Sequence, residues 1–220
     1  MTTNPISELG RLLDRSHDLE AEIDRLLGGA DYRLFDDSAR VVSSAAACQV
    51  SMEHGQGLRA LVVVGLPTSA VSLMRLQHEA LTRSAWLLYA AGDDQIAKLM
   101  GPLTKETEKA ANKLPMMKTM LDDLAGKAPA GAIEMLTHFK DVNAPSLHSF
   151  VHGGIHALQR GLTGYPVDLL ENVVRSSNGL LTMAGMMLAI LSGSEEVAKR
   201  MSQVQPAFRD CLPMLVAAGY

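Results

Sequence analysis

Cysteine and aromatic residues are scarce in this 220-residue chain, and long apolar runs are lacking. Cys48 and Cys211 are the only cysteines, and no CxxC pair is present. We therefore expect two reduced, buried thiols and neither a disulfide nor a cysteine-bound metal. The longest apolar run, Leu180–Leu191, is interrupted by Thr182 and Gly185 and is shorter than the roughly 20 residues that cross a bilayer. The N-terminus has no signal-peptide pattern, so we expect a cytoplasmic protein without membrane contact.

The overall composition favours a folded helical protein. Hydrophobic residues make up 47% and charged residues 20% of the chain, which argues against disorder. A net charge of −4 makes broad binding to nucleic acid unlikely, although a small local basic site is compatible with it. No useful strand alternation and no internal repeat is present, so we predict one all-α domain, a bundle of seven to nine helices over residues 1–220. Residues 101–142, rich in lysine and interrupted by proline, are predicted to form short helices that wrap the core or act as a lid.

A polar stripe on an otherwise apolar helix is the central feature of the sequence. At about 100° per residue, Arg75, Glu79, Arg83 and Trp86 fall on one side of a helix predicted over residues 67–91. Such a wide apolar arc predicts a central helix packed on several sides. The charged residues form either a solvated row of ion pairs or a half-buried network, and the arc favours the network. The predicted apolar positions are Val71, Leu73, Met74, Leu76, Ala80, Leu81, Ala85, Leu87 and Leu88.

Three histidines follow at helical spacing in residues 146–160. His148, His152 and His156 share one stripe if the helix is continuous, but Gly153-Gly154 favours a kink or a close backbone approach. We expect this helix to begin near Pro145, after Asn143 and Ala144. The favoured arrangement is a polar core in which a buried His152 is hydrogen-bonded to Glu79 or Glu53.

The spacing of these histidines is also compatible with a metal site. A His-x3-His pair can bind zinc, and Glu79, Glu53 or His54 would complete such a site. However, no acidic residue lies within residues 146–160 and HExxH is absent, so we predict no metal and no cofactor. The predicted ligand-binding residues are Arg75, Glu79, Arg83, His148, His152, Glu53 and His54, and the candidates for a catalytic role are His152, Glu79 and Arg75.

The order of these motifs resembles a group of uncharacterised bacterial helical proteins, families of unknown function. Their pattern is a Glu-His pair, then R-x3-E-x3-R-x2-W on a helix, then an aromatic-x-H-G-G motif. The matching residues here are Glu53, His54, Arg75, Glu79, Arg83, Trp86, Phe150, His152, Gly153 and Gly154. The resemblance spans roughly residues 30 to 195 and implies a compact bundle in which the polar residues converge. It departs at His78, where relatives have a bulky apolar residue, and His156 matches no position in the pattern.

Three functions are compatible with this pattern. The first is binding of a small anionic ligand or a partner at a joint Arg/Glu/His site. The second is a metal-independent, RNase-like hydrolase of a defence system, because some relatives resemble nuclease or abortive-infection bundles. Ribonuclease domains with an Arg-x4–6-His motif are matched formally by Arg11 and His17, but Asp14 and Asp18 beside them would repel a phosphate. The third is an oligomeric scaffold. A homodimer is expected from Leu180–Leu191 and the apolar last segment.

Overall fold

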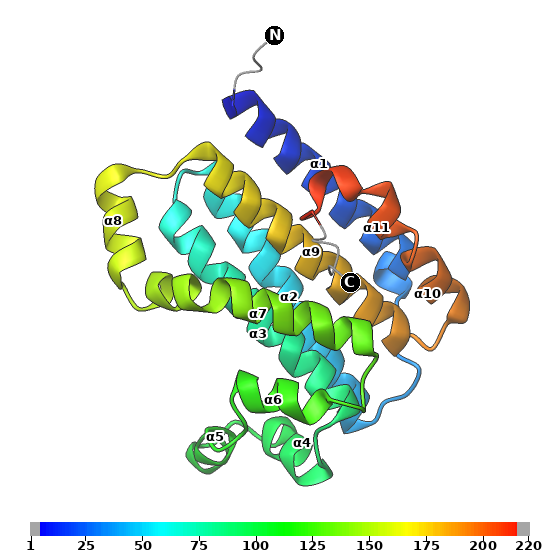
Figure 1. The fold of residues 1–220 in the computed structure, drawn as a ribbon. Coiled ribbons are helices and arrows are strands. Elements are labelled where there is room, and N and C mark those ends of the chain that lie inside the picture. Colours follow the sequence, from blue (N-terminus) through cyan, green and yellow to red (C-terminus); the bar gives the residue numbers. More distant parts are fainter. Residues whose placement is uncertain (1–4, 215–220) are drawn as a thin grey trace.

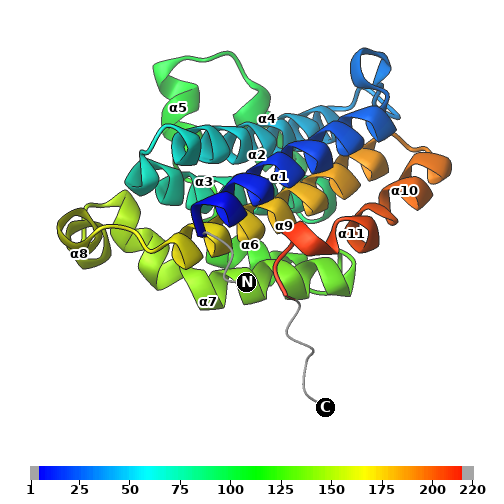
Figure 2. The same ribbon diagram turned by 90° about the horizontal axis from the view of Figure 1, so that it is seen from above.

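The structure, a computed structural model, describes residues 5–214, which form helices and no strand (Figure 1). Three long helices pack on one another at the centre: α2 (Ala39–Val63), α3 (Pro67–Tyr89) and α9 (Val167–Leu191). The helix α1 (Pro5–Leu27) packs along α9, and α7 (Ala130–Val151) crosses α3 on its outer side (Figures 1 and 2). The predicted all-α class and the central position of α3 are confirmed.

Shorter helices complete the fold at its periphery. The described residues contain more helices than the seven to nine predicted, because glycines and prolines divide the chain into short pieces. The positive φ of 64° at Gly153, for example, ends α7 and separates it from the next helix. These shorter elements are η1 (Gly29–Asp31), α4 (Asp93–Met100), α5 (Lys105–Ala111), α6 (Met117–Leu124), α8 (Ile155–Thr163), α10 (Glu195–Met201), α11 (Val204–Ala207) and η2 (Arg209–Cys211).

Small and polar residues hold the central helices at close range. Ser44 of α2 donates to the carbonyl of Ser84 on α3 at 2.9 Å, and Ser84 donates to the carbonyl of Ser44 at 2.8 Å. The Gln77 amide donates to the carbonyl of Ser177 on α9 and accepts from its hydroxyl, at 3.0 and 2.7 Å. A Cβ on Gly55 would lie 2.8 Å from the Gln77 amide nitrogen, so this approach requires glycine.

The burial of two residues of α3 differs from the prediction. Leu76, expected in the core, is 37% exposed, whereas Leu87 is 1% exposed and confirms its predicted position. Trp86 was placed on the polar stripe, but it is fully buried and its indole nitrogen donates to the Asp123 carboxylate at 3.1 Å. The indole therefore joins the core, with one charge-assisted hydrogen bond that satisfies its only donor.

Helix α7 runs through Pro145, so the predicted helix start at that residue is wrong. The helix begins at Ala130, and Pro145 lies inside it. Proline leaves the carbonyl one turn earlier without its usual donor, but packing of the helix against α3 keeps it continuous. The Asn143 amide donates to the carbonyl of Phe139 at 3.0 Å in the same turns. As a result, side chains before and after Pro145 share one face.

The apolar helix α9 is mostly a core helix. It is the one described helix that is long and apolar enough to cross a membrane, but 61% of its apolar window is buried within the protein. Most of Leu180–Leu191 packs inside the bundle, which removes most of the face on which a homodimer was predicted. The dimer stays a prediction, and the apolar segment over residues 215–220 lies outside the described residues.

Both cysteines are free and buried, as predicted. Cys48 donates to the carbonyl of Ala184 at 3.2 Å. Burial raises the pKa of the Cys48 thiol to about 12 and that of Cys211 to about 11, so neither is a thiolate at neutral pH.

Candidate functional site

Arg75 connects the third helix to the histidines of α7. Its Nε donates to the Glu79 carboxylate at 2.8 Å, and one terminal nitrogen lies 2.8 Å from Nδ1 of His148. The Glu79 and Arg75 side chains are 33% and 26% exposed, so this pair is partly solvated. The predicted meeting of charges from α3 with an imidazole from a later helix therefore occurs, and the imidazole in contact is that of His148.

The contact between Arg75 and His148 orients the imidazole. A guanidinium can only donate hydrogen bonds, so Nδ1 of His148 is the acceptor in this contact. Nε2 of His148 then carries the ring N–H and is available to a third group. The ring of His152 lies 4.4 Å from that of His148, at an angle of 50°.

A pocket, the Arg75 pocket, opens beside this contact. It has a volume of about 280 Å³ and is lined by Arg75, His78, Met117, Phe139, Lys140, Ala144, Pro145, Leu147 and His148. Lys140, Ala144 and His148 are four residues apart and lie on one face of α7 because that helix is continuous through Pro145. The Lys140 ammonium lies 3.1 Å from the Asp141 carboxylate, which is itself 61% exposed.

His78 supplies a neutral wall to the pocket. Its Nε2 donates to the carbonyl of Leu136 at 2.9 Å, and its ring stacks on Phe139 with centroids 4.5 Å apart. Burial lowers the pKa of His78 to about 4, so the ring is uncharged at neutral pH. The cationic groups of the pocket are thus Arg75 and Lys140, and His148 adds a polar N–H.

The structure separates several predicted residues from this group. His152, expected in the core, is exposed and follows the last residue of α7, so the favoured bond from a buried His152 to Glu79 or Glu53 is not formed. His156 lies beyond Gly153 on α8 and is also exposed. Glu53 is exposed and lines a shallow hollow between α1 and α2.

Arg83 and His54 are half-buried outside the Arg75 pocket. Within the described residues, Arg83 forms no ion pair with Glu79, so the predicted Arg–Glu–Arg network is reduced to Arg75 and Glu79. Among residues 5–214, no group of three or more His, Cys, Asp or Glu side chains is placed to hold a metal ion. The pocket therefore contains fewer of the predicted residues than the sequence indicated.

His78, Phe139 and Lys140 line the pocket but were not among the residues predicted to bind a ligand. A signal was present, because Lys140 precedes His148 by eight residues, which is close to two helical turns. A helix that began at Pro145 would contain His148 but not Lys140. The predicted start therefore hid the face that these two residues share. Because α7 is continuous, Lys140 and His148 both line the pocket that also contains Arg75.

The fold and site together define an all-helical protein with a small, partly cationic pocket between a central helix and a helix that crosses it. Residues 48–214 match the family described as Family of unknown function (DUF6988). The match covers more than half of the chain, so the protein belongs to this family, and the predicted resemblance to a helical family of unknown function is confirmed. No curated protein and no solved structure matches the chain.

Proposed function

We propose that this protein binds a small anionic ligand in the Arg75 pocket. The observation that supports the proposal is the placement of Arg75, Lys140 and His148 around one hollow of about 280 Å³. Glu79 holds the guanidinium through Nε, which leaves N–H groups on the terminal nitrogens for an anion. Hydrogen bonds from charged groups to an anion are about twice as strong as neutral ones.

The size and charge of the pocket favour a compact anion over a polymer. Arg75 offers several N–H donors in one plane, which suits the oxygens of a phosphate or carboxylate group. Lys140 adds a point charge and His148 adds Nε2–H, so three kinds of donor surround one position. The net charge of −4 on the whole chain disfavours a long run of phosphates, which would need a wider basic surface.

Titration calorimetry with inorganic phosphate at constant ionic strength tests the proposal. Arg75→Gln and Lys140→Gln are each expected to weaken phosphate binding about 10-fold or more, because a hydrogen bond to a charged group contributes roughly 1.5–3 kcal/mol. Arg83→Gln is the matched control, since it removes the same charge from α3 outside the pocket. Saturable binding that Arg75→Gln leaves unchanged, or no binding by the wild type, contradicts the proposal.

Metal-independent hydrolysis is a second candidate, favoured by two exposed imidazoles that lie side by side, one of them in contact with Arg75. His148 and His152 lie with ring centroids 4.4 Å apart, so one ring can accept a proton while the other donates one. The test is cleavage of single-stranded RNA by purified protein in the presence of EDTA. Turnover by the wild type that is lost in both His148→Gln and His152→Gln supports it. RNA that stays intact with the wild type, or cleavage at the wild-type rate by either variant, disposes of it.

A further inference from the structure

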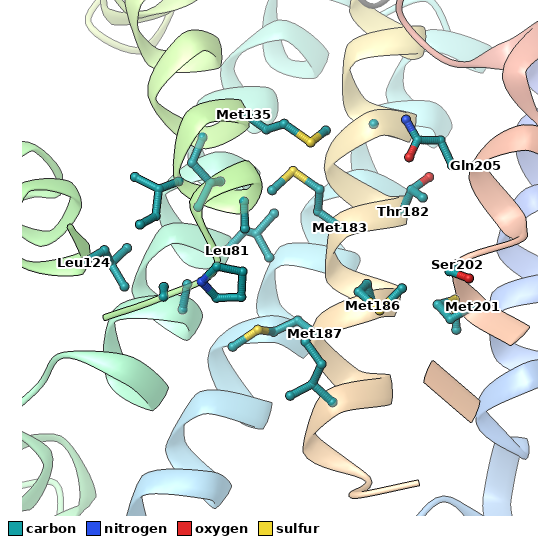
Figure 3. Close-up of a pocket in the computed structure, with 18 of the residues that line it drawn as sticks. Leu81, Leu124, Met135, Thr182, Met183, Met186, Met187, Met201, Ser202 and Gln205 are labelled. Carbon is teal, nitrogen blue, oxygen red and sulfur yellow. The ribbon is translucent and has the colours of Figure 1, made fainter. Parts of the chain in front are cut away.

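A second cavity lies on the other half of α7 and is lined mainly by apolar residues, among them five methionines. It has a volume of about 280 Å³ and lies between α7 and α9, against α3 (Figure 3). Its five methionines are Met135, Met183, Met186, Met187 and Met201, and the name methionine cavity refers to this group. The cavity shares no lining residue with the Arg75 pocket, so the two sites can be tested separately.

None of the residues that line the methionine cavity carries a charge. Apart from Tyr89, the polar lining consists of Thr182 of α9, Ser202 at the end of α10 and Gln205 of α11, which lie on the same side in Figure 3. The opposite side is formed by apolar residues such as Leu81 and Leu124. A charged ligand would lose its hydration here without finding an opposite charge, whereas a neutral one loses little.

The packing of the bundle explains why this space is not filled by the protein itself. Helices α7 and α9 both pack on α3 but scarcely on each other, so they flank the cavity. Methionine side chains are flexible and adapt to guests of different shape. Apolar cavities of roughly 150 Å³ already bind benzene, so a cavity nearly twice as large accommodates a larger molecule.

We propose that the methionine cavity binds an uncharged, mainly hydrocarbon small molecule that carries one hydrogen-bond donor. The hydrocarbon part would lie among the methionines, Leu81 and Leu124. The donor would face Thr182, whose hydroxyl already donates to the carbonyl of Asn178 at 2.9 Å and keeps its lone pairs as acceptors. The ligand is larger than benzene, about the size of a two- or three-ring aromatic molecule.

The test uses N-phenyl-1-naphthylamine, a neutral aromatic amine that fluoresces in apolar surroundings. Titration of the full-length protein is expected to give saturable fluorescence with one site per chain. Met183→Glu places a charge in the neutral lining, and Ala132→Phe fills part of the space, so each should weaken binding 10-fold or more. Met116→Glu is the control, because Met116 is 81% exposed and lies outside the cavity.

Two measurements keep the result interpretable. Circular dichroism and phosphate titration show whether Met183→Glu and Ala132→Phe retain the fold, and a folded variant that binds the probe as tightly as the wild type overturns the proposal. The proposal also fails if the wild type gives no saturable signal, or if many probes bind per chain.

Other occupants of the cavity give different results. The chain continues past Pro213, a lining residue, into the apolar residues 215–220. If the probe binds only after Leu215→Asp and Val216→Asp are introduced together into the full chain, the cavity belongs to that segment and the proposal is wrong. If probe binding disappears as dimers form in sedimentation runs, a second copy of the chain is the occupant and the proposal is also wrong.

Discussion

At the scale of single residues, burial and partners determine what each charged side chain contributes. Arg75 and Glu79 are partly solvated, so their ion pair orients a guanidinium more than it stabilises the fold. Arg59 on α2, by contrast, is 9% exposed as a side chain and pairs with Glu20 on α1, which is 14% exposed. The strongest single-charge effects on stability are therefore expected at the junction of α1 and α2, away from the Arg75 pocket.

Glu20→Ala should destabilise the protein by roughly 3–5 kcal/mol, because it leaves the Arg59 guanidinium buried without its partner. Chemical denaturation at neutral pH measures this loss. Glu22→Ala is the control on the same helix, since its partner Arg25 is 63% exposed and such pairs contribute about 1 kcal/mol or less. Equal losses in the two variants would show that the Glu20–Arg59 pair is solvated.

His78 is expected to make the fold sensitive to mild acid. Its pKa is about 4 in the folded protein and 6.5 as a free side chain, so the unfolded chain binds the proton first as the pH falls. Stability from this group is complete above about pH 6.5 and is lost progressively as the pH falls toward about 4. By linkage, the stability lost through His78 between roughly pH 7.5 and pH 5 is about 2 kcal/mol.

Denaturation curves of the wild type and His78→Leu at these two pH values test this expectation. Leucine cannot bind a proton, so the variant should lose about 2 kcal/mol less than the wild type on acidification. Glu79 and Lys140 also act on His78, in opposite directions and less than burial does, and both are retained in the variant. Parallel losses in the two proteins would show that His78 is protonated to the same extent in the folded and unfolded states.

At the scale of helices, the sequence predicted the all-helical class and the central helix but not which residues face each other. The apolar arc of α3 located this central helix. Helical periodicity describes one helix at a time, so it did not reveal which neighbour covers each side of α3. For this reason the exposure of Leu76 and the burial of Trp86 were not predicted.

Leu87→Ala should destabilise the protein by roughly 2–5 kcal/mol, because the side chain is 1% exposed and its removal leaves a cavity. Leu76→Ala, on the same helix, should cost much less, since that side chain is 37% exposed and keeps part of its contact with water. Urea denaturation of both variants measures the difference. A cost for Leu76→Ala that equals that for Leu87→Ala would mean that Leu76 is covered in solution, for example by a second chain.

At the scale of the whole molecule, α7 connects two chemically different hollows. Its first half lines the methionine cavity, and its second half lines the Arg75 pocket. Leu136 belongs to the first, and its carbonyl accepts from His78, which belongs to the second. The sequence indicated the polar site through Arg75, Glu79 and His148, but the apolar cavity depends on how α7 and α9 are spaced, which no local pattern encodes.

The central claim is that Arg75 and His148 meet at a pocket that takes an anion, and nitrogen NMR of the histidine rings tests it most directly. We predict that the ring N–H of His148 is on Nε2, because Nδ1 accepts from Arg75. Added phosphate should shift the His148 signals saturably and leave His54, which lies outside the pocket, unchanged. A hydrogen on Nδ1 of His148, or equal responses of His148 and His54 to phosphate, would contradict the account.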